Sequence, residues 1–418
     1  MVYRSIRRII YSVRGWIQQY SERNDLWKWL IFPLVIVLLV TACIVLTDLD
    51  YPFRSDEEHF IATIEFFGNN YQPGTALDYP EMTGPLFYYV YALWGKMSGF
   101  SPDNLRILNL LLSAVTFILM YVLYGRVLRD LKIVLSGMIL LLLNPYYAGL
   151  SMHVFTDMSA LLFIVLIALA VYLRNPSLLL ISTACALLTR QYSVFLVISA
   201  AVYFFLLYRV RGRFRTGSFI ALLCGVFPIL ALMLLWKGAA PPSGILRWVI
   251  DDGSVYRLRY IYIYIIFMTI SLLPVLIYAY RTLLKNGLNI LAGFLLSLTY
   301  FFLPVRSSFV TLEQTGRTTV GLMHGFMRGL LNNSHLEQFF LWIFCWAGFV
   351  TLLHMIRTDI KRMGSGECDF GCFLTLSVIL FLLIMPFSYQ VWEKYLVVVL
   401  PFALLRLLMM IGTGRKSS

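Results

Sequence analysis

Apolar stretches recur from one end of the sequence to the other, and they limit the fold more than any other feature. Of the 418 residues, 60% are hydrophobic and only 13% are charged, whereas a typical soluble domain is nearer half apolar and a quarter charged. Many stretches are long enough to cross roughly 30 Å of hydrocarbon as helices. The sequence therefore predicts an all-α, polytopic protein integral to a lipid bilayer.

About twelve transmembrane helices are expected, with boundaries accurate to a few residues. They cover about 29–46, 104–125, 133–150, 158–173, 177–189, 192–208, 218–236, 260–280, 288–304, 338–356, 371–387 and 395–411. The chain then divides into an interfacial segment at 1–28, a single transmembrane domain at 29–411 and a tail at 412–418. A first outer loop is expected at 47–103, and within it the aromatic stretch Gly84 to Gly99 is expected to lie as an interfacial helix.

The net charge of +13 is explained by topology. Lysines and arginines concentrate in one set of alternate loops and in both termini, whereas most acidic residues lie in the other set. The positive-inside rule places the basic set and both termini in the cytoplasm. The basic excess therefore does not require a nucleic-acid partner, and the larger loops, including 47–103, are expected on the non-cytoplasmic face.

The first outer loop opens with the most concentrated group of ionisable residues in the chain, Ser55-Asp56-Glu57-Glu58-His59. Asp56 and His59 stand three apart and share a helix face, while Glu57 points elsewhere. A carboxylate partly desolvated at the lipid boundary can act as a general base for a hydroxyl group. The alternative is a solvated loop that is acidic by chance.

Later outer segments supply further polar candidates. Asp157 precedes an apolar run, where it can support the site or simply complement a helix N-terminus. Arg190-Gln191 interrupts two apolar runs, and an arginine at that depth needs either a structural carboxylate or an anionic ligand such as phosphate. The remaining candidates are Arg257, Arg259, His335, Glu393, Lys394 and Tyr395. An acidic first loop opposed by basic later loops suits an enzyme that binds a lipid-linked phosphate and deprotonates a polar acceptor.

The layout of these residues resembles the multispanning, lipid-phosphosugar-dependent glycosyltransferases of the GT-C fold. In that fold the first outer loop opens with an acidic motif and continues into an interfacial helix introduced by Pro-Leu. Asp56-Glu57 and Gly84-Pro85-Leu86 match this pattern.

Within that group, the sequence is most similar to the dolichyl-phosphate-glucose-dependent α-1,2-glucosyltransferases of N-glycan precursor assembly. Their motifs, in chain order, have counterparts here in Asp56-Glu57 with His59, Pro80 to Pro85, Phe155-Thr156-Asp157, Arg190-Gln191 and Glu393-Lys394-Tyr395 before Pro401. This chain departs from the family where His59 comes one residue early, where a single Pro85 replaces a double proline, and where Lys394 replaces arginine.

The resemblance implies that residues 29–411 form a catalytic domain for inverting transfer of a hexose, glucose in that family, from a polyprenyl-phosphate sugar to a glycan or lipid-linked acceptor. It implies Asp56 as the general base with Glu57 or His59 orienting it, and Asp157 as an acceptor contact or support. Arg190, Gln191, Lys394, Arg257 and Arg259 would hold the donor phosphate. Neither a cofactor nor a metal is expected, because cationic side chains can stabilise a phosphate leaving group.

Two alternatives belong to other classes. A transporter or flippase for a lipid-linked substrate would place ionisable groups near mid-membrane on broken helices, whereas here they gather at the outer edge. A membrane glycan ligase or polymerase would share the charged outer loops, and only the position of Asp56-Glu57 disfavours it. The membrane is expected to be the bacterial inner membrane or the endoplasmic reticulum.

Overall fold

The computed structural model describes residues 26–54, 56–128, 130–212, 215–248, 255–306 and 319–414. Every regular element within these ranges is an α-helix or a short 3-10 helix, which confirms the all-α prediction. The interfacial segment expected at 1–28 lies almost entirely outside the described residues, as does most of the tail at 412–418. The chain forms two compact units, unit 1 (Met1–Val197 and Arg215–Val249) and unit 2 (Ile198–Phe214 and Ile250–Ser418).

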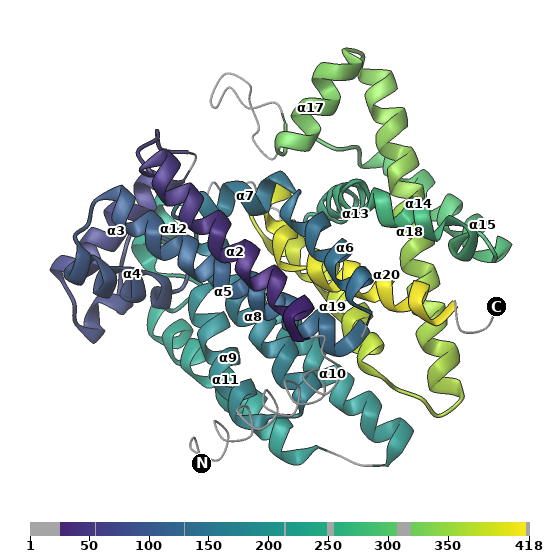
Figure 1. Ribbon diagram of the computed structural model, residues 1–418, viewed down its shortest axis with the longest axis horizontal. Coiled ribbons are helices and arrows are strands. Elements are labelled where there is room, and N and C mark those ends of the chain that lie inside the picture. The colour runs from purple at the N-terminus through teal and green to yellow at the C-terminus, as the bar shows by residue number, and fades with distance from the viewer. Residues whose placement is uncertain are drawn as a thin grey trace. The chain divides into compact units, whose positions relative to one another are not determined.

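Unit 1 contains the helices drawn from purple to teal in Figure 1. They are α2 (Leu26–Thr47), α3 (Glu57–Asn69), η1 (Pro73–Leu77), α4 (Pro85–Ser98), α5 (Pro102–Leu128), α6 (Leu131–Leu142), α7 (Pro145–Met152), α8 (Thr156–Leu173), α9 (Pro176–Thr189), η2 (Gln191–Ser193), the start of α10 (Val194–Arg211), α11 (Thr216–Trp236) and α12 (Pro242–Trp248). The predicted helix at Gly84 to Gly99 is present as α4.

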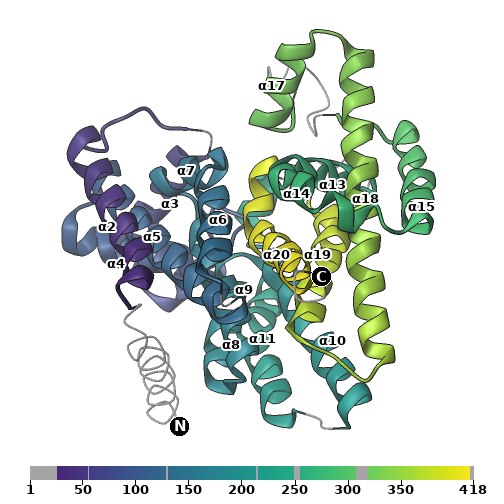
Figure 2. The same ribbon diagram turned by 45° about the vertical axis from the view of Figure 1, so that its right-hand side comes forward.

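Unit 2 contains most of α10 and the green and yellow helices of Figures 1 and 2. They are α13 (Arg259–Ser271), α14 (Leu273–Leu283), α15 (Gly287–Leu298), η3 (Thr299–Phe302), α17 (Leu322–Leu331), α18 (Ser334–Gly364), α19 (Phe370–Ile384), η4 (Met385–Phe387), η5 (Glu393–Val398) and α20 (Leu400–Gly414). The division into a single domain at 29–411, which the sequence suggested, stays a prediction.

In the described part of the chain, seven helices are long and apolar enough to cross a membrane, or nine if each of two bent pairs is one span. Three shorter apolar helices, at Pro176–Thr189, Gly287–Phe302 and Leu400–Ile411, add to them. The protein is therefore an integral, multi-pass membrane protein. The total of about twelve spans and the side of the membrane on which the loops lie stay predictions.

Two expected spans are broken rather than continuous. The span predicted at 133–150 consists of α6 and α7, which meet at 64°, and the one predicted at 260–280 consists of α13 and α14, which meet at 94°. In each case a proline, Pro145 or Pro274, stands in the first turn of the second helix. Proline fits that position but cannot continue a preceding helix, and Asn144 adds an N-cap for α7 by accepting from the Tyr146 amide at 3.0 Å.

The position of α8 within unit 1 determines where polar residues can gather. Its residues are buried over most of their length, whereas α2 exposes large side chains such as Leu34 and Leu38 on the surface expected to meet lipid. Residues at the N-terminal end of α8 are therefore surrounded by protein. Asp157 lies there, and the polar segment 47–103 packs nearby through Phe60, whose ring is 6.1 Å from that of Phe155.

Candidate active site

Glu57, the first residue of α3, lies in a buried ion-pair cluster. Its carboxylate accepts hydrogen bonds from Arg106 Nε at 2.8 Å, Arg106 Nη2 at 2.9 Å and the Val154 amide at 3.0 Å, and it lies 2.7 Å from His153 Nδ1. Burial alone would raise the pKa of Glu57, but these hydrogen bonds outweigh it and lower the pKa to about 2. The carboxylate is thus buried, ionised and surrounded by donors.

Arg106 of α5 extends this Glu57 cluster (Glu57, Arg106 and His153) to the end of α2. Its Nη1 donates to the carbonyl oxygens of Leu49 at 2.7 Å and Tyr51 at 2.9 Å, and its guanidinium lies 4.1 Å from the centre of the Tyr51 ring. The cluster therefore joins the α2–α3 link, α3, α5 and the approach to α8. It holds the N-terminus of α3, and with it the preceding residue Asp56, in place.

Asp56, His59 and Glu81 form a second group, the Asp56 cluster. His59 Nδ1 lies 2.7 Å from Glu81 Oε1, and His59 Nε2 lies 3.7 Å from Asp56 Oδ1. Although burial lowers the pKa of His59, its two carboxylate partners raise it to about 9, so the ring is an imidazolium at neutral pH. The Glu81 side chain is 4% exposed, that of His59 is 20% exposed and that of Asp56 is 34% exposed, so Asp56 is the most accessible member of the cluster.

The segment that carries Glu81 is fixed by its neighbours in unit 1. The Gly84 amide donates to the Thr189 carbonyl at 3.1 Å, and Gln191 Nε2 donates to the Met82 carbonyl at 3.0 Å. A Cβ on Gly84 would stand only 2.0 Å from the Leu188 carbonyl oxygen, so only glycine permits this approach. Residues 81–84 are therefore docked against the end of α9 and the start of η2, which holds Glu81 beside His59.

Asp157 and Arg190 form the pair that the sequence left open between an ion pair and an anionic ligand. Arg190 Nη2 donates to the two Asp157 carboxylate oxygens at 3.3 and 3.4 Å, and the Tyr192 hydroxyl donates to Oδ1 at 3.1 Å. Asp157 is completely buried, and the Arg190 side chain is 12% exposed. A structural carboxylate partner is thus present for Arg190, and Gln191 binds backbone carbonyl groups.

Three partners in these clusters were not among the residues predicted from the sequence: Glu81, Arg106 and His153. Arg106 lies inside the apolar stretch 104–125, where an ionisable residue signals a buried partner, and that signal could have found it. Glu81 stands 22 positions from His59, and no local spacing relates the two. His153 stands 96 positions from Glu57, so only the tertiary structure reveals that pair.

Arg257 and Arg259 both line a cavity of about 310 Å³ in unit 2. The Arg257 amide donates to the Pro386 carbonyl at 2.9 Å, and its Nη1 donates to the Ser388 carbonyl at 3.2 Å. Their role in holding the donor phosphate stays a prediction.

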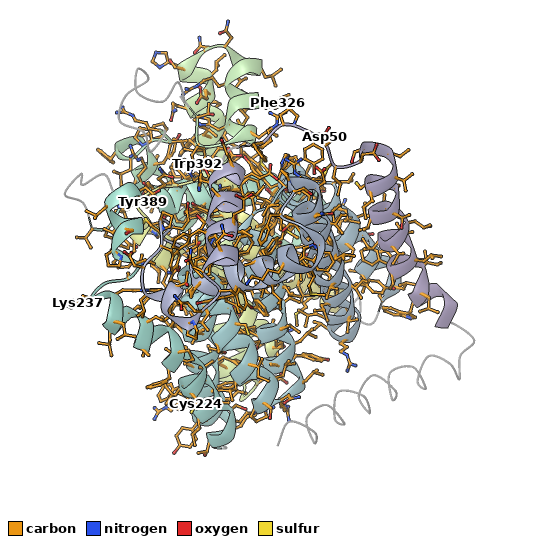
Figure 3. All side chains as sticks on the ribbon, turned by 90° about the vertical axis from the view of Figure 1, so that its left-hand side faces the viewer. Asp50, Cys224, Lys237, Phe326, Tyr389 and Trp392 are labelled. Atoms are coloured by element: carbon orange, nitrogen blue, oxygen red, sulfur yellow. The ribbon has the colours of Figure 1, made fainter. Side chains whose placement is uncertain are left out.

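The first three residues of η5 do not share one set of contacts; they are Glu393, Lys394 and Tyr395. The Glu393 carboxylate accepts from the amides of Met323 at 2.9 Å and His324 at 2.8 Å, so it caps the N-terminus of α17. Lys394 is largely buried, with its Nζ 6.0 Å from the Trp392 ring and 5.9 Å from the Tyr395 ring. Trp392 and Tyr389 of this segment are labelled in Figure 3.

His335 is exposed at the start of α18, whereas the buried histidine of this region is His324. His324 Nε2 lies 2.6 Å from Glu337 Oε1, and Arg328 Nε donates to Glu337 Oε2 at 3.1 Å. Burial lowers the pKa of His324 despite the nearby carboxylate. This network ties α17 to α18, and the sequence did not single it out.

One group in the described part of unit 2, Asp359, Asp369 and Cys372, has possible metal-ligand atoms within 4.8 Å of one another. Both carboxylates already have cationic partners, because Arg406 Nη2 donates to Asp359 and Arg362 Nη1 donates to Asp369 at 2.5 Å. Asp369 also caps α19 through the Gly371 amide at 2.8 Å. With each carboxylate neutralised by arginine, the group fits an ion-paired network rather than a metal site.

The sites of unit 1 and unit 2 thus contain different parts of the predicted set. Asp56, Glu57, His59, Asp157, Arg190 and Gln191 lie in unit 1, and the remaining candidates lie in unit 2.

Comparison with known proteins yields one structural likeness. No family model and no curated protein matches the sequence. The structure is similar to ArnT from Cupriavidus metallidurans, whose crystal structure was determined bound to undecaprenyl phosphate, with a TM-score of 0.42 and 15% sequence identity over 93% of this chain and 78% of ArnT. A likeness at this level identifies neither a family nor a function.

Proposed function

We propose that this protein is a membrane glycosyltransferase of the GT-C type that moves a hexose from a polyprenyl-phosphate sugar to a hydroxyl group of a glycan or lipid-linked acceptor. Glucose is the sugar that the sequence resemblance favours. The reaction takes place on the non-cytoplasmic face, and the anomeric configuration is inverted.

The Asp56 cluster is the observation that carries this proposal. It combines one carboxylate that solvent reaches, Asp56, with an imidazolium, His59, and a second, buried carboxylate, Glu81. The charged ring holds the Asp56 carboxylate in one orientation, and Glu81 holds the ring. An accessible carboxylate with a fixed orientation, at the edge of a membrane protein, suits removal of a proton from a substrate hydroxyl.

In the proposed reaction, the acceptor hydroxyl oxygen attacks the anomeric carbon of the donor sugar and forms the new glycosidic bond. Asp56 takes the hydroxyl proton. The bond between the anomeric carbon and the phosphate oxygen breaks, and its electron pair leaves with the polyprenyl phosphate. His59 and Glu81 are positioning residues, because they act on Asp56 and need not touch the substrate.

The other candidates divide according to their contacts. We assign Glu57 to the structure of unit 1, because donors surround its buried carboxylate. We assign Arg190 to an ion pair with Asp157. Arg257, Arg259 and Lys394 keep the phosphate-binding role that the resemblance implies, in which cationic side chains stabilise a phosphate leaving group without a metal ion.

The test is sugar transfer by the purified, full-length protein in lipid nanodiscs with a panel of polyprenyl-phosphate sugars. The wild type is expected to consume one of these donors. Asp56→Asn is expected to lower turnover by about 10²-fold or more, the contribution of a general base, while donor affinity and thermal stability stay near those of the wild type. Glu58→Gln is the matched control, because Glu58 is an exposed neighbour of the same charge.

Near-normal transfer by Asp56→Asn would remove Asp56 as the base. Movement of an intact donor across a vesicle membrane, with no sugar transferred, would show that the protein is a transporter and refute the proposed enzymatic function. Arg190→Ala tests whether Arg190 forms a structural ion pair with Asp157 or binds phosphate. Loss of stability with unchanged donor affinity would support the ion pair. Selective loss of donor affinity would make Arg190 a phosphate ligand.

A further inference from the structure

A cavity of about 210 Å³ lies in unit 1 between α2, α5 and the bent pair α6 and α7. Two of these helices supply most of its wall. The lining residues of α2 are Ile36, Leu39, Val40 and Cys43, and those of α5 are Leu110, Ser113, Ala114 and Phe117. Both sets have the spacing i, i+3, i+4, i+7, so each forms a stripe about 10 Å long on one face of its helix. The cavity is therefore a slot that runs along α2 and α5.

Helix α2 is attached to α5 on both sides of this slot. Near the start of α2, the ring of Phe32 lies 4.7 Å from that of Tyr121 in α5, and beyond the end of α2, Arg106 of α5 donates to the Leu49 carbonyl at 2.7 Å. Between these contacts, the lining residue Leu39 is 51% exposed on the surface expected to meet lipid. The slot is thus a gap between two fixed contacts, and it reaches the lipid-facing surface of α2.

Ser151 of α7 places one unpartnered polar group in the wall of the slot. The residue is 8% exposed, and its hydroxyl is buried without a hydrogen-bond partner among the described residues. The backbone around it is satisfied, because Asn109 Nδ2 donates to the carbonyls of Leu150 at 2.7 Å, Ser151 at 2.9 Å and His153 at 2.7 Å. Since Asn109 directly precedes Leu110, these bonds place Ser151 at the Leu110 end of the slot.

Water is a poor occupant of this slot. A buried water molecule makes about two to four hydrogen bonds, whereas the wall consists mainly of aliphatic and aromatic side chains. The other serine of the wall, Ser113, already donates to the Asn109 carbonyl at 2.8 Å. An empty slot would forfeit the van der Waals contacts of its wall and leave the Ser151 hydroxyl unsatisfied. The occupant that fits is largely apolar and carries one hydrogen-bond acceptor at its end.

We propose that the slot binds one acyl chain of a glycerophospholipid, and that the ester carbonyl of this chain accepts a hydrogen bond from the Ser151 hydroxyl. A slot that follows two helices matches a single extended chain better than the fused rings of a sterol. The ester stands where the hydrocarbon of the lipid ends and the headgroup begins, which places the acceptor at one end of the chain. The phosphate then lies beyond the slot.

A polyprenyl phosphate fits this slot less well. Its phosphate is attached directly to the hydrocarbon, so filling the slot would bring a charged group to Ser151, and none of the described lining residues is charged. Arg106 lies one helical turn before Leu110, but each of its guanidinium nitrogens already donates to Glu57 or to backbone carbonyls. The slot therefore favours an uncharged acceptor, and the inference does not depend on sugar transfer.

A bound chain would connect three helices of unit 1. It fills the gap between α2 and α5, and its ester lies against α7, whose Met152 carbonyl accepts from the Tyr51 hydroxyl. The next residue, His153, belongs to the Glu57 cluster. We expect the chain to stabilise this part of the fold, since each lining side chain gains contacts that an empty slot lacks.

Binding can be measured with the full-length protein in detergent micelles, after removal of endogenous lipid. The probe is a phosphatidylcholine with a photoreactive diazirine in one acyl chain, and mass spectrometry locates the labelled residues. Label is expected at residues 36–43 and 110–117, and excess unlabelled diester phosphatidylcholine is expected to displace it. Dialkyl ether phosphatidylcholine, which has the same chains and headgroup without the carbonyls, should displace the label about fivefold less well, the effect of one hydrogen bond.

Ser151→Ala is expected to make the ester and ether lipids equal competitors. Ser113→Ala is the matched control and should leave the preference unchanged, because Ser113 lines the same slot but its hydroxyl is already bound within α5. Ala114→Phe, which fills the slot, is expected to reduce labelling about tenfold, whereas Val115→Phe, at an exposed neighbour outside the slot, should not. The two serine variants decide the question even where a larger side chain disturbs folding.

Equal displacement by ester and ether lipids in the wild type, or a preference that survives Ser151→Ala, would overturn the hydrogen bond to the ester carbonyl. Label spread evenly over the exposed surface of α2, rather than along the two stripes, would show that the slot holds no lipid and overturn the proposal. Undecaprenyl phosphate or cholesterol that displaces the label more strongly than phosphatidylcholine would overturn the assignment to a phospholipid.

Discussion

Asp56 and Glu57 are neighbours in the sequence, yet their carboxylates lie in two regions that differ in how far they bury and compensate a negative charge. In the Glu57 cluster, every oxygen faces a donor, and the carboxylate and Arg106 are excluded from solvent. In the Asp56 cluster, the Asp56 carboxylate lies 3.7 Å from the His59 imidazolium, and about a third of its side chain stays exposed. A buried carboxylate whose negative charge is fully compensated by hydrogen-bond donors has a structural role. A carboxylate that has a fixed orientation but is partly exposed stays available for chemistry.

Glu57→Gln is expected to give the largest effect on folding. The substitution leaves the buried Arg106 without its charged partner, and loss of one member of a buried ion pair costs about 3–5 kcal/mol. The free energy of unfolding in detergent measures this change. Glu58→Gln, on the exposed face of α3, should stay within about 0.5 kcal/mol of the wild type. A stable Glu57→Gln protein without transferase activity would place Glu57 in the chemistry and remove the distinction between the two regions.

Glu81→Gln is expected to affect turnover more than folding. With one carboxylate partner gone, the pKa of His59 falls from about 9 toward its ordinary value, and the orientation of Asp56 loosens. We expect the turnover number to fall roughly tenfold, a fraction of what a general base supplies, with KM little changed. The alkaline limb of the pH–rate profile should move to lower pH, and Glu81→Asp should restore part of the rate. A uniform loss of activity at every pH would indicate a merely structural role.

The two regions are also expected to lose stability at opposite ends of the pH scale. The pKa of His59 is raised above 6.5, so its contribution to stability is complete below about pH 6.5 and is lost as pH rises through about 9. The pKa of Glu57 is lowered below 4.5, so its contribution is complete above about pH 4.5 and is lost as pH falls toward 2. Melting temperatures across this range should show that His59→Asn flattens the alkaline limb alone and Glu57→Gln the acid limb alone.

Gln191→Ala is expected to have the smallest effect. The side chain donates to the Met82 carbonyl beside Glu81, and loss of one such hydrogen bond costs about 1 kcal/mol. Melting temperature and donor affinity should be measured together. Reduced stability with unchanged donor affinity would confirm that Gln191 supports the segment carrying Glu81, and the opposite result would return Gln191 to the phosphate-binding role that the family resemblance implied.

Local pattern was sufficient for part of the site. The i, i+3 spacing of Asp56 and His59 predicted that they share a face, and the structure places their charged atoms 3.7 Å apart. The same spacing argument placed Glu57 on a different face of the helix. The Glu57 side chain does point toward Arg106 of α5. Arg190, which the sequence predicted to need either a carboxylate or an anionic ligand, forms an ion pair with Asp157, and its role in binding the donor phosphate stays a prediction. The spans predicted at 133–150 and 260–280 were expected to be continuous, but each consists of two helices that meet at an angle. Apolar composition alone does not show where one helix ends and the next begins at a proline.

The sequence by itself determined that this is a helical membrane protein and which short stretch concentrates its charge, because hydrophobicity and local spacing are properties of neighbouring residues. Only the tertiary structure decided which carboxylate is neutralised and which stays accessible. Arg106, His153 and Glu81 come from distant positions, and the environment of Asp56 and Glu57 depends on where the chain brings them. Burial and long-range pairing set the pKa and accessibility of an ionisable group, and neither can be read from the residues beside it.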